Sequence, residues 1–249
     1  MDHQDVSYIA IDLAKDTFWV QTDTIGFSVA NTLKGIAQML SKTRSLQNRH
    51  FVCEASGGYE RLLIDTHHAK GHTISLVSAA RVRDFARSDG IKAKTDPIDG
   101  RLILRFAKEK RPAPTPPPSP QRRLLMDLLD RREQLSEQLK REKTRLQKPG
   151  CAKAVMASTK RMIASTTGEL AKIDALIEKT VESDPMMGRA FKTLTAIKGI
   201  GAVNAWSIIT YLPEITTTSR SEIAALAGLA PFNRDSGKYQ GLRHIFGGR

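Results

Sequence analysis

Cysteine is scarce in this sequence, which has only Cys53 and Cys151 among its 249 residues. Two thiols cannot build a disulfide framework or a zinc cluster, and Cys53 lies in an apolar run where we expect it to pack as a small hydrophobic residue. Long hydrophobic runs are lacking as well: no apolar stretch approaches membrane-spanning length, and the N-terminus MDHQD has no apolar signal core. We therefore expect a cytoplasmic protein with no membrane partner.

Negative charge is in short supply. The chain has 39 Lys and Arg against 26 Asp and Glu, which gives a formal net charge of +13 and a pI near 9.9. Such an excess favours a polyanionic partner, and nucleic acid is the usual one. An apolar content of 40% is enough for a folded core.

The N-terminal part of the chain alternates strand-like and helix-like patterns. Its first three β-rich segments are too closely spaced for crossover helices, so we expect them to pair antiparallel. The order of the later segments then predicts an α/β domain with a mixed sheet over residues 1–111. The predicted strands are 8–14, 18–23, 27–31, 50–56 and 73–79, and the predicted helices are 34–46, 58–71 and 96–108.

A proline-rich segment divides the chain. Residues 111–120 read RPAPTPPPSP, with six prolines, and predict a semi-rigid linker over 112–120. Beyond it, leucines recur at helical spacing, which predicts an antiparallel coiled-coil hairpin over 121–183. The leucine stripe of its first helix is Leu124, Leu128, Leu135, Leu139 and Leu146.

Residues 184–249 are expected to form a mainly α-helical domain. The Gly-Ile-Gly sequence at 199–201 is typical of a helix–hairpin–helix turn, which presents backbone N–H groups to a phosphate. The same glycines also fit an ordinary helix C-cap before the next helix. Both interpretations stay open from the sequence.

Four acidic residues are candidate metal ligands. Asp96, Pro97 and Asp99 form a well-capped helix start, which by itself explains both aspartates. Asp12 and Glu54, however, lie inside apolar strand segments, where a buried carboxylate is unfavourable unless it is paired or bound to a metal. Together the four supply hard oxygen ligands of the kind that Mg²⁺ uses in phosphoryl chemistry. An actin-like kinase is set aside because no glycine-rich phosphate loop follows Asp12.

Several blocks resemble a known family. They are IAIDLAKDTFWV, CEASGGYERLL, VRDFARSDGIKAKTDPIDGRLILRFA and, far downstream, LAGLAPFNRDSGKYQGLRHIFGGR. In content and order they resemble the DEDD transposases of bacterial insertion sequences and the related Piv-type DNA invertases. The resemblance covers nearly the whole chain, and its last two blocks are the most specific.

The resemblance implies a RuvC-like domain of the RNase H fold, with Asp12, Glu54, Asp96 and Asp99 as its acidic tetrad and Mg²⁺ as cofactor. It also implies a nucleophilic serine, Ser236, in the C-terminal domain. Members of the family act on DNA as dimers or tetramers, with a composite site from two subunits, and are guided by a structured RNA.

The implied reaction is strand exchange, in which Ser236 attacks phosphorus and the DNA end is held as a phosphoserine. Two alternatives remain: a RuvC-like nuclease in which water attacks, and an inactive remnant that only binds nucleic acid. The sequence departs from the family pattern at Gly100, where alanine is usual, and at Arg249, beyond which relatives continue. We expect Gly100 to weaken its helix by up to ~1 kcal/mol, and we expect the chain to be C-terminally truncated.

Overall fold

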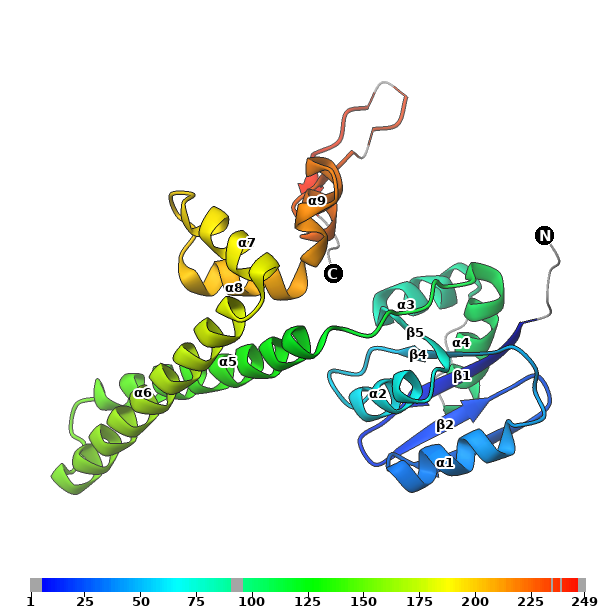
Figure 1. The fold of residues 1–249 in the computed structure, drawn as a ribbon, viewed down its shortest axis with the longest axis horizontal. Helices are drawn as coiled ribbons and strands as arrows, with labels where there is room; N and C mark the ends of the chain where they lie inside the picture. Colours follow the sequence, from blue (N-terminus) through cyan, green and yellow to red (C-terminus); the bar gives the residue numbers. More distant parts are fainter. Residues whose placement is uncertain (1–5, 91–95, 234, 238, 246–249) are drawn as a thin grey trace. The chain divides into compact units, whose positions relative to one another are not determined.

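The computed structural model describes residues 6–90, 96–233, 235–237 and 239–245, with Asp96, Pro97 and Thr216 described by their backbone alone (Figure 1). The chain forms two compact units, Met1–Pro117 and Pro118–Arg249. The boundary between the units lies inside the predicted linker. Each unit has its own hydrophobic core.

The first unit is built on a five-stranded mixed sheet. Strands β1 (Ser7–Leu13), β2 (Thr17–Gln21) and β3 (Gly26–Ala30) form an antiparallel meander, and β4 (Arg49–Glu54) and β5 (Thr73–Val77) pair in parallel beyond β1. The strand order is β3-β2-β1-β4-β5. The predicted antiparallel triplet and the mixed sheet are confirmed.

One face of the sheet is covered by α1 (Leu33–Lys42) and α2 (Arg61–Ala69). Strand residues that alternate along the chain share a face, and Ile11 and Cys53 point into this core with no exposed surface. Cys53 is therefore the small buried hydrophobic residue that the sequence predicts.

The opposite face is covered by α3 (Ala79–Ser88) and α4 (Asp96–Lys110), which pack on Ala10 and Val52. From the sequence alone, no helix is expected at Ala79–Ser88. This helix buries only Val82 and Phe85, and two apolar residues in an arginine-rich stretch are too few for a periodic signal.

The first half of the proline-rich segment belongs to the first unit. Thr115 N donates to the Ile74 carbonyl at 2.8 Å, and Leu76 N donates to the Thr115 hydroxyl at 2.9 Å. The Ser75 hydroxyl donates to the Ala113 carbonyl at 2.7 Å. Because threonine and alanine alternate with the prolines, the segment still offers partners to the edge of β5, and it protects that edge from pairing with other chains. Only the residues after Thr115 are left to act as the spacer that the sequence predicts.

The second unit is mainly helical, as predicted. Two long helices, α5 (Pro120–Leu146) and α6 (Lys153–Glu182), run antiparallel and pack side by side (Figure 1). We call this pair the arm. It is followed by α7 (Pro185–Thr195), α8 (Ala202–Tyr211), a 3₁₀ turn (Pro213–Thr216), α9 (Arg220–Leu226) and the short strands β6 (Pro231–Phe232) and β7 (His244–Ile245).

The predicted leucine stripe of α5 is partly wrong. Leu124 is 48% exposed, whereas Leu125 and Leu129 are buried with Leu128 against Ile177 of α6. The base of α5 packs on α6 and also on Trp206 of α8, so this part of the helix buries a wider face than a simple heptad seam. The buried face is therefore centred on Leu125, Leu128 and Leu129 and leaves Leu124 outside it.

Candidate active site

Asp12 and Glu54 lie at the ends of two neighbouring parallel strands. In the pairing of β1 with β4, Ile11 lies opposite Cys53, so the next residue of each strand is one of the two acids. Both side chains project towards the α3–α4 face, because Ile11 and Cys53 project into the other core. Both acids are half-buried. The sheet therefore places Asp12 and Glu54 on the same face, side by side at the C-terminal ends of β1 and β4.

The first turn of α4 packs on this corner. Gly100 is buried, and a Cβ added to it would lie 2.5 Å from Cδ1 of Trp19, whose Cα partner across β1 and β2 is Asp12. Asp99, half-buried, precedes Gly100 in the same turn. The close approach explains why glycine stands here: a methyl group would collide with the indole ring. The sequence-based view of Gly100 as only a helix-weakening residue was incomplete.

The acidic residues fit a magnesium site by their chemistry. Carboxylate oxygens are ligands that Mg²⁺ prefers, and Asp12 and Glu54 supply them at the same end of two adjacent strands. Among the side chains that the structure describes, which do not include Asp96, no group of three or more His, Cys, Asp or Glu is placed to hold a metal ion. Asp12, Glu54 and Asp99 each have an interaction partner in the fold. The tetrad stays a prediction, with three of its members on the α4 side of the sheet.

Ser236 lies in a tight turn between β6 and β7. Its N–H and C=O each form a 3.0 Å hydrogen bond with the backbone of Tyr239, and Gly237 between them has a φ of +58°. That left-handed conformation favours glycine at the position after the serine. The Asp235 carboxylate accepts from Gly241 N at 3.2 Å and closes the loop. The turn presents the Ser236 side chain to solvent.

Comparison with known families accounts for both regions. A model of DEDD transposases matches residues 9–149, which include all four acidic residues, and a model described as the transposase family IS116/IS110/IS902 matches residues 191–249, which include Ser236. The chain belongs to the IS110 family of transposases. It is thus an enzyme of DNA recombination.

Two curated relatives are similar over most of the chain. They are the pilin gene-inverting proteins of Moraxella lacunata and Moraxella bovis, each 26% identical over 240 residues, which is 93% of this chain and 74% of the relative. In the part of the transposase that the structure describes, no helix is both long and apolar enough to span a membrane.

The sequence gives no sign of a side chain that ties together the loops after the strands of Asp12 and Glu54. The Asn31 amide donates to the Tyr59 carbonyl at 3.1 Å and to the Ala14 carbonyl at 3.4 Å. Ala14 follows the strand of Asp12, and Tyr59 lies in the loop that follows the strand of Glu54. Asn31 follows β3 far from either acid in sequence, so no local pattern could have identified it.

The loop after Glu54 is held by a second acid. Glu60 is 9% exposed, and its carboxylate accepts from the Ser56 hydroxyl at 2.6 Å, from Ser56 N at 3.1 Å and from Gly58 N at 2.9 Å. Burial alone would raise the pKa of Glu60, but these hydrogen bonds outweigh burial and lower the pKa. Ser56 and Glu60 four residues apart around two glycines were the available sequence signal.

The Gly-Ile-Gly turn joins α7 to α8. Gly199 has a φ of +98°, and it lies three residues beyond the α7 cap residue Ala196. In the ordinary glycine cap the left-handed residue comes directly after the cap, so this simpler interpretation is wrong. The N-cap residue of α8 is Gly201, which has no side chain that could cap the first turn. Phosphate binding by this turn stays a prediction.

Proposed function

We propose that this transposase cuts and exchanges DNA strands of an insertion sequence at a RuvC-like magnesium site, with Ser236 as the nucleophile. The observation that carries the proposal is the placement of Asp12 and Glu54 at the ends of adjacent parallel strands, on the face against which α4 brings Asp99. Asp96 is the first residue of the same helix.

The strand order supports the RuvC-like assignment. An antiparallel meander whose first strand lies at the centre, with two parallel strands beyond it, is the arrangement that an RNase H fold requires. Two antiparallel helices of 27 and 30 residues support the coiled-coil assignment of the arm.

The metal and the protein have separate tasks in this proposal. Asp12, Glu54, Asp96 and Asp99 would hold Mg²⁺, which when bound neutralises charge on the scissile phosphate. Ser236 Oγ gives its proton to solvent and forms a bond to phosphorus, the bond from phosphorus to the 3′-oxygen breaks, and the leaving 3′-oxygen takes up a proton to become a free 3′-hydroxyl. The phosphoserine keeps the energy of the phosphodiester, so the 3′-hydroxyl of a new strand can displace the serine without ATP.

The carboxylates and Ser236 belong to different compact units. The proposal therefore requires the two units to meet on DNA, and we propose that they do so between subunits of a dimer or tetramer. A structured RNA encoded by the element is the proposed guide to the target, and the basic composition of the chain suits such a partner.

Ser236→Ala tests the nucleophile. Strand exchange in the presence of Mg²⁺ should be abolished, whereas the parent chain should trap labelled DNA as a covalent adduct that survives denaturing electrophoresis. The adduct should disappear in Asp12→Ala and on removal of Mg²⁺. Ser221→Ala removes another exposed serine hydroxyl from the same unit and should keep parental activity. Cleavage by Ser236→Ala at the parental rate would show that water attacks, and that the enzyme is a nuclease.

A further inference from the structure

The distal end of the arm has an unusual concentration of positive charge. Residues 140–161, which we call the arm tip, contain eight Lys and Arg and one acidic residue, Glu142. The rest of the arm, 120–139 and 162–182, contains six basic and eight acidic residues. The arm tip thus accounts for seven of the thirteen net positive charges of the chain.

The charge of the arm tip is available to a partner. All eight basic side chains are exposed. Arg141 pairs with Glu137 at 3.4 Å and Arg145 with Glu142 at 2.5 Å. For the other six no ion pair is found within the described part of the chain: they are Lys140, Lys143, Lys148, Lys153, Lys160 and Arg161.

The first unit has a smaller basic surplus, 17 Lys and Arg against 13 Asp and Glu over residues 1–117, and some of its basic side chains are paired. Arg105 pairs with Asp89 and Glu109, and Lys108 pairs with Asp23. A charge that already has a partner gains less from a phosphate than one that has only water. The arm tip is therefore the stronger polyanion surface of the two.

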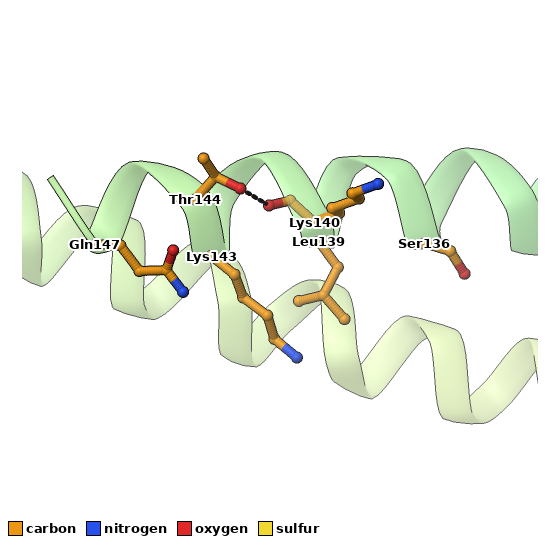
Figure 2. Close-up of a pocket in the computed structure, with 6 residues that line it drawn as sticks. All are labelled: Ser136, Leu139, Lys140, Lys143, Thr144 and Gln147. Carbon is orange, nitrogen blue, oxygen red and sulfur yellow. Dashed lines mark hydrogen bonds between the residues drawn. The ribbon is translucent and has the colours of Figure 1, made fainter.

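The arm carries this charge away from the packed part of the second unit. At 1.5 Å per residue, Lys140 lies ~30 Å along α5 from its first residue, Pro120. Near the arm tip Leu139 and Lys143 extend from α5 towards α6, beside an open hollow of about 330 Å³ whose lining has two lysines and no acidic residue (Figure 2).

The composition of the arm indicates which form of nucleic acid fits. Residues 120–182 contain no Phe, Tyr, Trp or His. Proteins that hold unpaired bases stack them mainly on such rings, so the arm tip lacks the aromatic platform on which a single strand is usually held. Lysines without aromatic neighbours suit the phosphates of a duplex, which they contact without reading sequence.

We propose that the arm tip is a sequence-independent binding surface for the backbone of duplex DNA. The choice of DNA rests on the proposed strand-exchange function, whereas the preference for a duplex rests on charge and composition alone. The arm tip would hold DNA at a distance from the α7–α8 end of the arm and add affinity without adding specificity.

The test removes four of the unpaired lysines, with Lys140, Lys148, Lys153 and Lys160 each replaced by Gln. Duplex DNA affinity of the purified chain, measured by fluorescence anisotropy across a salt series, should fall at least ~10-fold near 0.1 M salt. The slope of log affinity against log salt should become shallower by ~3, equally for two unrelated sequences. The matched control replaces four exposed lysines elsewhere, Lys34, Lys70, Lys172 and Lys179, and should change the slope by less than ~1.

Three outcomes would overturn the inference. The first is that the arm-tip variant binds duplex DNA with parental affinity, and the second is that the control variant loses as much DNA affinity as the arm-tip variant. The third is that the arm-tip variant loses affinity for duplex RNA but keeps its DNA affinity, which would assign the surface to RNA. The proposed function fails separately, because binding needs no chemistry: if Ser236→Ala still exchanges strands while the arm-tip variant loses DNA affinity, only the nucleophile assignment is wrong.

Discussion

The acidic residues and Ser236 are held in opposite ways. Asp12 and Glu54 project from central strands of a sheet with a hydrophobic core on both faces. Ser236 projects from a turn between two-residue strands whose side chains are all exposed. The proposed metal ligands would have to be fixed within a fraction of an ångström, which a doubly covered sheet can provide. The proposed nucleophile, on a hairpin whose described strand residues are all exposed, would take its final position from the surface against which the hairpin packs.

This difference predicts that substitutions which loosen the packing of the first unit also displace Asp12 and Glu54. Substitutions of exposed residues in the second unit should have smaller effects on stability. Each unit contains one tryptophan, Trp19 in the first and Trp206 in the second, so the stability of each can be measured separately.

The largest expected difference between the units is in how much folding stability each loses at acidic pH. His67 is fully buried, and burial, which is the main cause, lowers its pKa to about 4. In the unfolded chain the His67 imidazole binds a proton near pH 6.5, whereas in the folded chain it does so only near pH 4. The contribution of neutral, buried His67 to folding stability is therefore complete above pH 6.5 and is lost as the pH falls towards 4. The loss is on the order of 3 kcal/mol. Burial lowers the pKa of His50 as well, so it acts in the same direction.

Fluorescence of Trp19 in a Trp206→Phe variant should therefore report unfolding of the first unit between pH 6.5 and 4. Fluorescence of Trp206 in a Trp19→Phe variant should change less, since the second unit has a single histidine, the exposed His244. His67→Leu should flatten the pH dependence of the first unit, and His244→Gln should not. Identical acid transitions at both tryptophans would contradict the comparison.

A smaller effect distinguishes two helical glycines. Gly100→Ala places a methyl group against the Trp19 indole and should destabilise the first unit by ~1–3 kcal/mol, with a loss of strand exchange. Gly168→Ala on α6 meets nothing within 4 Å and should be neutral or stabilising by up to ~1 kcal/mol. Urea unfolding followed at each tryptophan measures both. A stabilising Gly100→Ala would show that the indole moves aside freely.

The smallest effect concerns the link between the strand ends. Asn31→Ala removes the amide that binds the loops after β1 and β4, and should destabilise the first unit by ~1 kcal/mol. Strand exchange should fall more than this stability loss explains, because Asp12 and Glu54 lose their common support. Asn204→Ala, exposed on α8, is the control. If the two variants exchanged strands at the same rate, Asn31 would not be needed to position Asp12 and Glu54.

Local patterns were enough to predict most elements of the fold. The antiparallel triplet followed from strand segments too close for crossovers, the helix beginning at Asp96 from its capping pattern, and the domain boundary from prolines at 112–120. The acids inside the strands were found because a carboxylate among apolar residues is an unfavourable choice without a partner. Each of these signals acts within a few residues along the chain.

Tertiary structure alone decided which faces meet. It set the buried stripe of α5 on Leu125 rather than Leu124, placed Gly100 against Trp19, and brought Asn31 between two loops. It also turned Thr115 from linker into a partner of the edge strand. These contacts join residues many positions apart, and sequence periodicity shows that a residue has an apolar or polar face without showing what that face will pack against.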